Sequence, residues 1–288
     1  MRRDPKLFWL IACLACGMLT RAAAAADDEA NALYVMRPDG SEVRQVARVG
    51  DNRAHLYPRW SHDGKRLAFE VFVIGTRDRR IYVVNVDGSE LREVAPHSMP
   101  DWSPDDKQLV SHHFLGGDAA PEVYVQNVEG GGQELVTHGR GPRWSPDGSK
   151  LVVSDLTNLI VTDLVSGDET KLFDEPVEAL FSGFDWSPDS KQVAVVVRRV
   201  ANPARELWLI DARGEEFGLT MRMRTAASGA LSWSPDATQI ALSTQEKIHI
   251  VNVAGTHGAR LIPGQNGKNH CPAWSPDVKW IAFVSDRK

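Results

Sequence analysis

Histidines recur in this sequence shortly before a tryptophan. His55, His97, His138 and His270 each stand four to six residues ahead of one. Imidazole nitrogens bind divalent transition metals, and near neutral pH they also exchange hydrogen bonds with peptides. The spacing therefore leaves three interpretations open: a metal site, a surface that contacts a polar peptide or ligand, and histidines that are merely solvated.

The tryptophans that follow these histidines belong to a repeat with steps of 42, 42, 42, 47 and 41 residues. Its six copies are centred on Trp60, Trp102, Trp144, Trp186, Trp233 and Trp274. After each comes Ser, then Pro or His, then Asp, and an aliphatic residue follows seven positions after the tryptophan. A period near 42 residues is typical of four-stranded propeller blades. We predict an all-β, six-bladed β-propeller with the tryptophans buried between blades.

The Ser-Pro-Asp-Gly segment predicts a tight turn between two strands. Proline fixes φ, serine and aspartate bond the nearby backbone, and glycine accepts a left-handed conformation. The strand after the turn, such as LVVSD at 151–155, is apolar on successive residues, which indicates burial on both faces. Because the turn gives its aspartates a sufficient role, a cation site on that rim is the less favoured alternative. These aspartates are Asp63, Asp105, Asp147, Asp189, Asp236 and Asp277.

The two ends of the repeat array complement each other. Residues 31–47 match the second half of a repeat, and residues 271–288 match the first half. We therefore predict that the last blade is shared between N- and C-terminal strands, which closes the ring and removes exposed strand edges. One propeller domain is expected over residues 27–288.

The first 26 residues have the pattern of a secretory signal peptide. Basic residues at positions 2, 3 and 6 precede an apolar run over 7–19 and an alanine tract that ends at Ala26. The run is shorter than the ~20 residues of a membrane span. We expect cleavage near Ala26 and residence in the periplasm, with a lipoprotein anchored at Cys13 as the alternative. Cys271 would then be the one cysteine left, so no internal disulfide is expected.

Charge restricts the classes of partner. Removal of the signal takes away four basic residues and one acidic residue, so the formal charge moves from -5 to -8. An acidic protein disfavours nucleic acid and anionic membrane surfaces as partners. The sequence has no G-x-S-x-G nucleophile motif. We expect a protein that is not an enzyme, holds no cofactor and is a monomer.

The repeat resembles a known family. Trp-Ser-Pro-Asp-Gly at 144–148, IAF at 281–283 and YVVNVDGS at 82–89 resemble the WD40-like repeat called PD40, found in TolB-like propellers. The resemblance implies a periplasmic propeller that binds envelope proteins or peptides, as in the Tol-Pal system, here without the α/β domain that precedes the propeller in that family. The repeat is also similar to that of prolyl oligopeptidase-like hydrolases and of a metal-dependent oligogalacturonate lyase. A polysaccharide lyase-like, metal-dependent enzyme is therefore the alternative function.

Charged residues directly precede four of the tryptophans. Arg59, Asp101, Arg143 and Asp185 alternate in sign across four consecutive blades, close to the expected axis. Because charges near a protein interior need partners, we expect a ladder of salt bridges between blades. A polar channel that contacts a ligand is the alternative.

The loops that lead into the inner strands are the predicted binding surface. These loops vary in sequence while the opposite turns keep their motif, and variable loops on a rigid scaffold commonly carry recognition. His112 and His113 are expected to approach the same rim. We predict no metal ligand and no catalytic residue; the predicted contact residues are Arg53, His55, His97, His138, Arg140 and His270.

Overall fold

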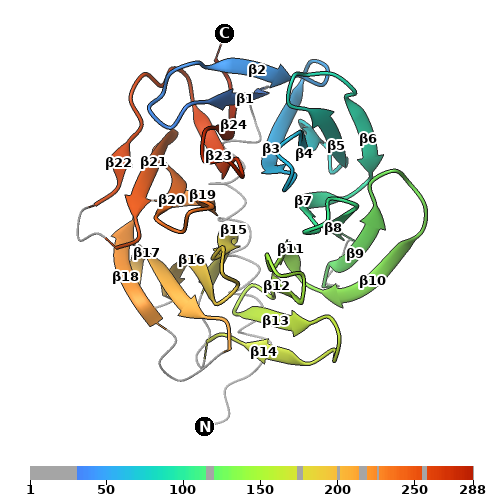
Figure 1. Ribbon diagram of the computed structural model, residues 1–288, viewed down its shortest axis with the longest axis vertical. Coiled ribbons are helices and arrows are strands. Elements are labelled where there is room, and N and C mark those ends of the chain that lie inside the picture. The colour runs from blue at the N-terminus through green and yellow to red at the C-terminus, as the bar shows by residue number, and fades with distance from the viewer. Residues whose placement is uncertain are drawn as a thin grey trace.

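The protein is a ring of six four-stranded antiparallel sheets around a central axis (Figure 1). The computed structural model describes residues 31–114, 120–173, 178–199, 202–213, 219–225, 227–254 and 258–287. In these segments every regular element is a strand, and no helix is long and apolar enough to cross a membrane. The predicted all-β, six-bladed propeller is confirmed.

Each blade runs from an inner strand at the axis to an outer strand at the rim. Blade 1 consists of β3 (Arg53–Trp60), β4 (Arg66–Val73), β5 (Arg79–Asn85) and β6 (Arg92–Ala95). Blade 2 consists of β7 (Ser98–Trp102), β8 (Gln108–His113), β9 (Glu122–Asn127) and β10 (Gln133–His138). Blade 3 consists of β11 (Arg140–Trp144), β12 (Lys150–Ser154), β13 (Leu159–Asp163) and β14 (Glu169–Lys171).

The remaining blades repeat this arrangement. Blade 4 consists of β15 (Glu178–Trp186), β16 (Gln192–Arg199), β17 (Asn202–Asp211) and β18 (Leu219–Thr225). Blade 5 consists of β19 (Ala227–Trp233), β20 (Gln239–Thr244), β21 (Lys247–Asn252) and β22 (Arg260–Leu261). Blade 6 consists of β23 (Asn269–Trp274), β24 (Ile281–Ser285), β1 (Ala32–Met36) and β2 (Arg44–Ala47).

Blade 6 closes the ring with strands from both ends of the array. The strand order in this sheet is β2-β1-β24-β23 (Figure 1), and β1 pairs antiparallel with β24, with Leu33 opposite Val284. Every blade therefore has four strands, and the shared last blade predicted from the sequence is confirmed.

The hairpin between the first two strands of each blade is fixed by its own side chains. In the first copy the Ser61 hydroxyl donates to Asp63 Oδ1 at 2.7 Å and accepts the backbone N–H of Arg66 at 2.9 Å. The residue after the aspartate is left-handed even where it is not glycine, with φ of 58° at Asp106 and 61° at Val278. The aspartates thus form the turns, as expected.

The core lies between the blades rather than within one central layer. The second strands are almost fully buried, as two-sided packing requires. The tryptophans add hydrogen bonds between neighbouring blades: the indole N–H of Trp60 donates to the carbonyl of Ala273, and that of Trp102 to the carbonyl of Arg59, both at 3.1 Å. Trp186 makes the same bond to the carbonyl of Arg143, so three of the six indoles fasten their blade to the inner strand of the preceding one.

Candidate functional site

The central axis of the propeller has two open ends, which are lined by different parts of the repeat. The inner strands β3, β7, β11, β15, β19 and β23 surround it (Figure 1). Each inner strand ends at its tryptophan and the Ser-Pro-Asp turn, so these turns form one mouth, which we call the hairpin mouth. The residues that begin the inner strands form the other, which we call the loop mouth.

Four charged side chains meet on the axis between the two mouths. Arg59 Nη1 lies 3.3 Å from Asp185 Oδ2, and Arg59 Nε lies 3.7 Å from Asp101 Oδ1. Asp101 belongs to the next blade, whereas Asp185 belongs to the blade three positions on, so Arg59 spans the axis. Arg143 completes the set and is 1% exposed. We call Arg59, Asp101, Arg143 and Asp185 the axial quartet.

The contact between Arg59 and Asp101 joins neighbouring blades as the expected ladder does, whereas the contact between Arg59 and Asp185 departs from it because Arg59 is long enough to reach across the channel. Burial raises the pKa of Asp185, against the opposing influence of Arg59. Burial, together with the charge of Arg59, lowers the pKa of Arg143 to about 10. Two cations and two anions balance, which keeps the centre of the axis neutral overall.

The acidic members of the quartet also bind backbone of the next blade. Asp101 Oδ2 accepts the N–H of Trp144 at 2.8 Å, and Asp185 Oδ2 accepts the N–H of Trp233 at 3.2 Å. At the same repeat position, Ser232 accepts the N–H of Trp274 at 3.2 Å. The residue before each tryptophan therefore connects inner strands, whatever further role it has.

The hairpin mouth opens into a cavity of about 220 Å³. Its walls are tryptophans and turn prolines, and its floor includes three members of the axial quartet. The residues that line it are Arg59, Trp60, His62, Asp101, Trp102, Trp144, Pro146, Asp185, Trp186, Pro188, Ser232, Trp233, Pro235, Ala273, Trp274 and Pro276. From the sequence, a cation site among the turn aspartates was the less favoured alternative on this face, and no binding cavity was predicted there.

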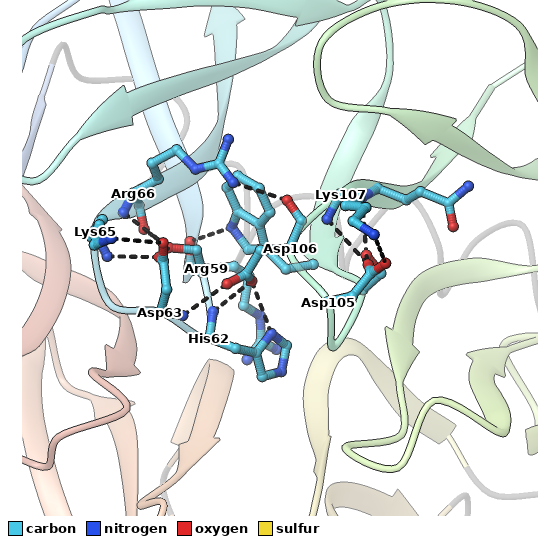
Figure 2. Close-up of polar contacts among 12 residues, drawn as sticks. Arg59, His62, Asp63, Lys65, Arg66, Asp105, Asp106 and Lys107 are labelled. Carbon is cyan, nitrogen blue, oxygen red and sulfur yellow. Dashed lines mark hydrogen bonds and ion pairs between the residues drawn. The ribbon is translucent and has the colours of Figure 1, made fainter.

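Neighbouring hairpins are tied together at this mouth. Figure 2 shows Asp106 of the second hairpin against the first: its carboxylate accepts the backbone N–H of His62 at 2.6 Å and that of Asp63 at 2.8 Å. His62 Nδ1 lies 3.2 Å from the same carboxylate. The rim of the cavity is therefore held in place between blades 1 and 2.

Two of the predicted contact histidines are buried, which corrects the expectation that all of them stand in open loops. His55 lies within β3 with no exposed surface, and its Nε2 accepts the N–H of Val49 at 2.9 Å. His97 is 3% exposed, and its Nδ1 lies 2.9 Å from the Ser111 hydroxyl. Burial lowers the pKa of each to about 4, so both are neutral at pH 7.

The other predicted contact residues stand at the loop mouth or on the rim of the ring. Arg53 and Arg140 are half-buried and begin inner strands. His270 is half-buried in β23, and burial lowers its pKa. His138 is exposed at the end of β10, an outer strand. The fold thus carries Arg53, Arg140 and His270 on inner strands and leaves His138 on an outer one.

His112 and His113 are consecutive residues of β8 in blade 2, so their side chains lie on opposite faces of the strand near the loop mouth. The ring of His113 stacks on His97 with centroids 5.1 Å apart, and His97 stacks on Tyr124 at 5.4 Å. His112 is 1% exposed and its Nδ1 accepts the N–H of Gly141 at 3.3 Å. Within the described part of the chain, no three histidine, cysteine or acidic side chains converge as metal ligands.

One structural position was missed from the sequence: the residue ten places after a tryptophan, which in three blades bonds a backbone N–H of the next blade. Glu70 accepts from Met99 at 3.0 Å, and Ser243 accepts from Cys271 at 3.0 Å. His112 makes the third such contact. The signal in the sequence was a polar residue at this offset in four of the six apolar strands; Val196 and Val284 take its place in the other two.

The three N–H groups bound in this way sit at bulges of the inner strands. Met99, Gly141 and Cys271 each lie three residues before a tryptophan, as Tyr57 does in β3, and all four have φ between 50° and 58°. A bulge changes the direction in which the side chains of a strand point. A residue other than glycine in the left-handed region has a strained backbone, and such residues cluster at functional sites. The loop mouth therefore combines strain with inter-blade bonds that maintain it.

Comparisons with known proteins agree with this geometry at the level of fold. No family model and no curated protein sequence matches the chain. A structure of putative TolB from Agrobacterium tumefaciens matches with a TM-score of 0.67 at 18% identity, over 88% of this chain and 97% of that one. TolB from Acinetobacter baumannii matches with a TM-score of 0.61 at 17% identity, over 91% of this chain and 65% of that one.

A third structure with this fold is an enzyme. Oligogalacturonate lyase from Vibrio parahaemolyticus matches with a TM-score of 0.54 at 11% identity, over 90% of this chain and 97% of that one. At these identities the likeness concerns the fold, which does not by itself determine function. The protein is thus a six-bladed β-propeller similar in structure to TolB.

Proposed function

We propose that the protein is a non-catalytic, TolB-like binding propeller of the cell envelope, and that its loop mouth binds an envelope protein or peptide. The signal-like first 26 residues and the acidic charge support an exported protein that avoids nucleic acid. Arg53, Arg140 and His270 would contact the partner at the mouth, with His138 at its outer edge. His55 and His97 would support these contacts from beneath the surface.

An exposed aromatic ring beside a cation carries this proposal. Phe114 is 43% exposed at the end of β8, and the guanidinium of Arg140 lies 5.0 Å from its ring centroid. The His112 ring packs edge-on against Phe114 at 4.7 Å, so the aromatic ring is positioned from within. Aromatic and arginine side chains on a rigid surface are the typical anchors of protein interfaces.

A metal-dependent lyase is the alternative, favoured by the structural similarity to oligogalacturonate lyase. His97 and His113 stack ring on ring, an arrangement without the convergent nitrogens of a metal site. The acidic charge also disfavours a polyanionic sugar substrate. Binding without catalysis is therefore the better-supported function.

Affinity capture from the native envelope tests the proposal. We expect the tagged protein to retain one partner in near-stoichiometric amount, and we expect the double variant His138→Ala/Arg140→Ala to lose it with its melting temperature unchanged within about 2 °C. Lys107→Ala, an exposed change on the hairpin face, is the matched control and should capture normally. Capture by the double variant at the wild-type level would contradict the proposal. A stoichiometric transition metal in the wild type, lost on changing His97, would instead favour the lyase.

A further inference from the structure

The cavity at the hairpin mouth lies at the other end of the axis from the proposed partner site and has the size of a socket for one side chain. Its volume of about 220 Å³ falls below the roughly 300–1,000 Å³ of pockets that hold cofactor-sized ligands. Tryptophan and proline side chains form its walls, and charged groups form its floor. A ligand that fits must therefore be small, with an apolar body and a polar tip.

One wall of this cavity differs from the others. The tryptophans at five repeat positions are between 1% and 8% exposed, whereas Trp144 is half-buried. Its indole N–H donates to the carbonyl of Gly148 in its own hairpin at 3.2 Å, rather than to the preceding blade as Trp102 does. Trp144 therefore contributes less to the join between blades and presents more of its ring to the cavity.

The floor offers hydrogen-bond acceptors. Asp101 and Asp185 line the cavity, and each side chain is 16% exposed. Arg59 lies between them, and its Nη2 is buried out of reach of a ligand in the cavity. A ligand group that donates to one of these carboxylates therefore gains affinity.

The charge balance of the cavity floor determines which polar group a ligand can place there. The axial quartet holds two cations and two anions, so an added ammonium, guanidinium or carboxylate would be a buried charge without its own partner. A neutral donor can bond an aspartate of the floor without adding a charge. A hydroxyl does this, and a hydroxyl on an aromatic ring also suits walls of tryptophan and proline.

We propose that the hairpin mouth is a second binding site, which receives a single tyrosine side chain from a partner protein. The phenol ring packs on Trp144 and the turn prolines, and its O–H donates to Asp101 or Asp185. Tyrosine is among the residues that most often anchor interfaces in such pockets. This site lies outside the proposed function, whose partner binds at the loop mouth.

Side-chain analogues test the chemistry of the socket directly. In titrations of the ¹⁵N-labelled protein, 4-methylphenol should bind saturably and shift the indole N–H signals of the cavity tryptophans, while those of Trp208 and Trp280 stay in place. Toluene lacks the hydroxyl and should bind at least about tenfold more weakly, because it covers the Asp101 and Asp185 carboxylates without donating a hydrogen bond. Equal binding of the two compounds, or shifts confined to other tryptophans, would overturn the proposal.

A pair of tryptophan variants separates the socket from general stability. Trp144→Leu should weaken 4-methylphenol binding at least fivefold while the melting temperature falls less than in Trp102→Leu, whose ring is 1% exposed. Trp280→Leu is the matched control, because Trp280 is also half-buried but lies outside the cavity, and it should bind like the wild type. Unchanged binding by a folded Trp144→Leu would contradict the assignment.

A photo-cross-linking residue identifies the source of the tyrosine. Pro235 is exposed at the rim of the cavity, so a photoreactive phenylalanine there should cross-link to a tyrosine-containing segment of a different protein in envelope extracts. The loop-mouth variant His138→Ala/Arg140→Ala should still give this product. A cross-link to residues of this same chain, or to a partner segment without tyrosine, would refute a tyrosine from a partner protein.

Discussion

Asp185→Ala removes the link that joins opposite sides of the propeller. In the native protein the Asp185 carboxylate pairs with Arg59 at 3.3 Å and accepts the N–H of Trp233 at 3.2 Å. Both charged side chains are largely buried, with side-chain exposures of 10% for Arg59 and 16% for Asp185. After the change Arg59 keeps only its 3.7 Å contact with Asp101. An almost unpaired charge then remains on the axis.

The expected loss can be estimated from the two interactions that disappear. Breaking a buried ion pair by removing one partner costs about 3–5 kcal/mol. The unpaired N–H of Trp233 adds about 1 kcal/mol. We therefore expect the free energy of unfolding to fall by about 4–6 kcal/mol. At roughly 2–4 °C per kcal/mol for a chain of this size, the melting temperature should fall by about 8–24 °C.

Urea unfolding followed by tryptophan fluorescence and by circular dichroism measures this loss and shows whether unfolding is two-state. Asp189→Ala, in the exposed hairpin of the same blade, is the matched control and should lose no more than about 1 kcal/mol. The double variant Arg59→Met/Asp185→Ala should be more stable than Asp185→Ala, because it removes the stranded charge as well. If Asp185→Ala loses no more than Asp189→Ala, water screens the axis and the reasoning is wrong.

Further predictions concern ring closure, pH and export. Deleting residues 31–47 removes two strands of blade 6, so the truncated ring should melt at a lower temperature by calorimetry; a melting curve like that of the intact protein would exclude closure by the shared blade. His97 has its pKa lowered to about 4 by burial, against about 6.5 unfolded, so the unfolded state binds more protons between these values and the free energy of unfolding should fall as pH falls from 6.5 to 4. His97→Gln should flatten that slope in urea titrations, and an unchanged slope would assign the dependence to other groups. Cell fractionation with N-terminal sequencing should find a periplasmic protein that begins near Asp27; Met1 retained in the cytosol would contradict export, and a lipidated Cys13 would indicate the anchored form.

Much of the fold could be predicted because each copy of the repeat determines its own strands and turn through contacts between residues close in sequence. The positions of Trp60 and its five counterparts mark the end of each inner strand. Residues 31–47 and 271–288 match complementary halves of one repeat, which shows how the ring closes. The roles of the turn serines and aspartates follow from contacts over two to five residues, which do not depend on the rest of the fold. Local chemistry repeated six times therefore determines the architecture.

The site was harder to predict because it depends on distances across the ring. His55 and Arg140 have similar offsets from a tryptophan, yet a bulge and the pairing with the second strand bury one and leave the other at the mouth. The reach of Arg59 to Asp185 depends on the width of the channel, which no repeat encodes. The cavity beside Trp144 arises from turns whose sequence indicates only a hairpin.

Hydrogen–deuterium exchange of the protein bound to its captured partner tests the central proposal most directly, because it maps the contact surface without a substitution. We predict slower exchange at residues 53–57, 97–99, 138–141 and 269–271, which include the bulges and the predicted contacts of the loop mouth. Exchange at the outer strands β14 and β22 should stay as in the free protein. Protection confined to the outer strands, with the loop mouth unchanged, would contradict a propeller that binds its partner at this end of the axis.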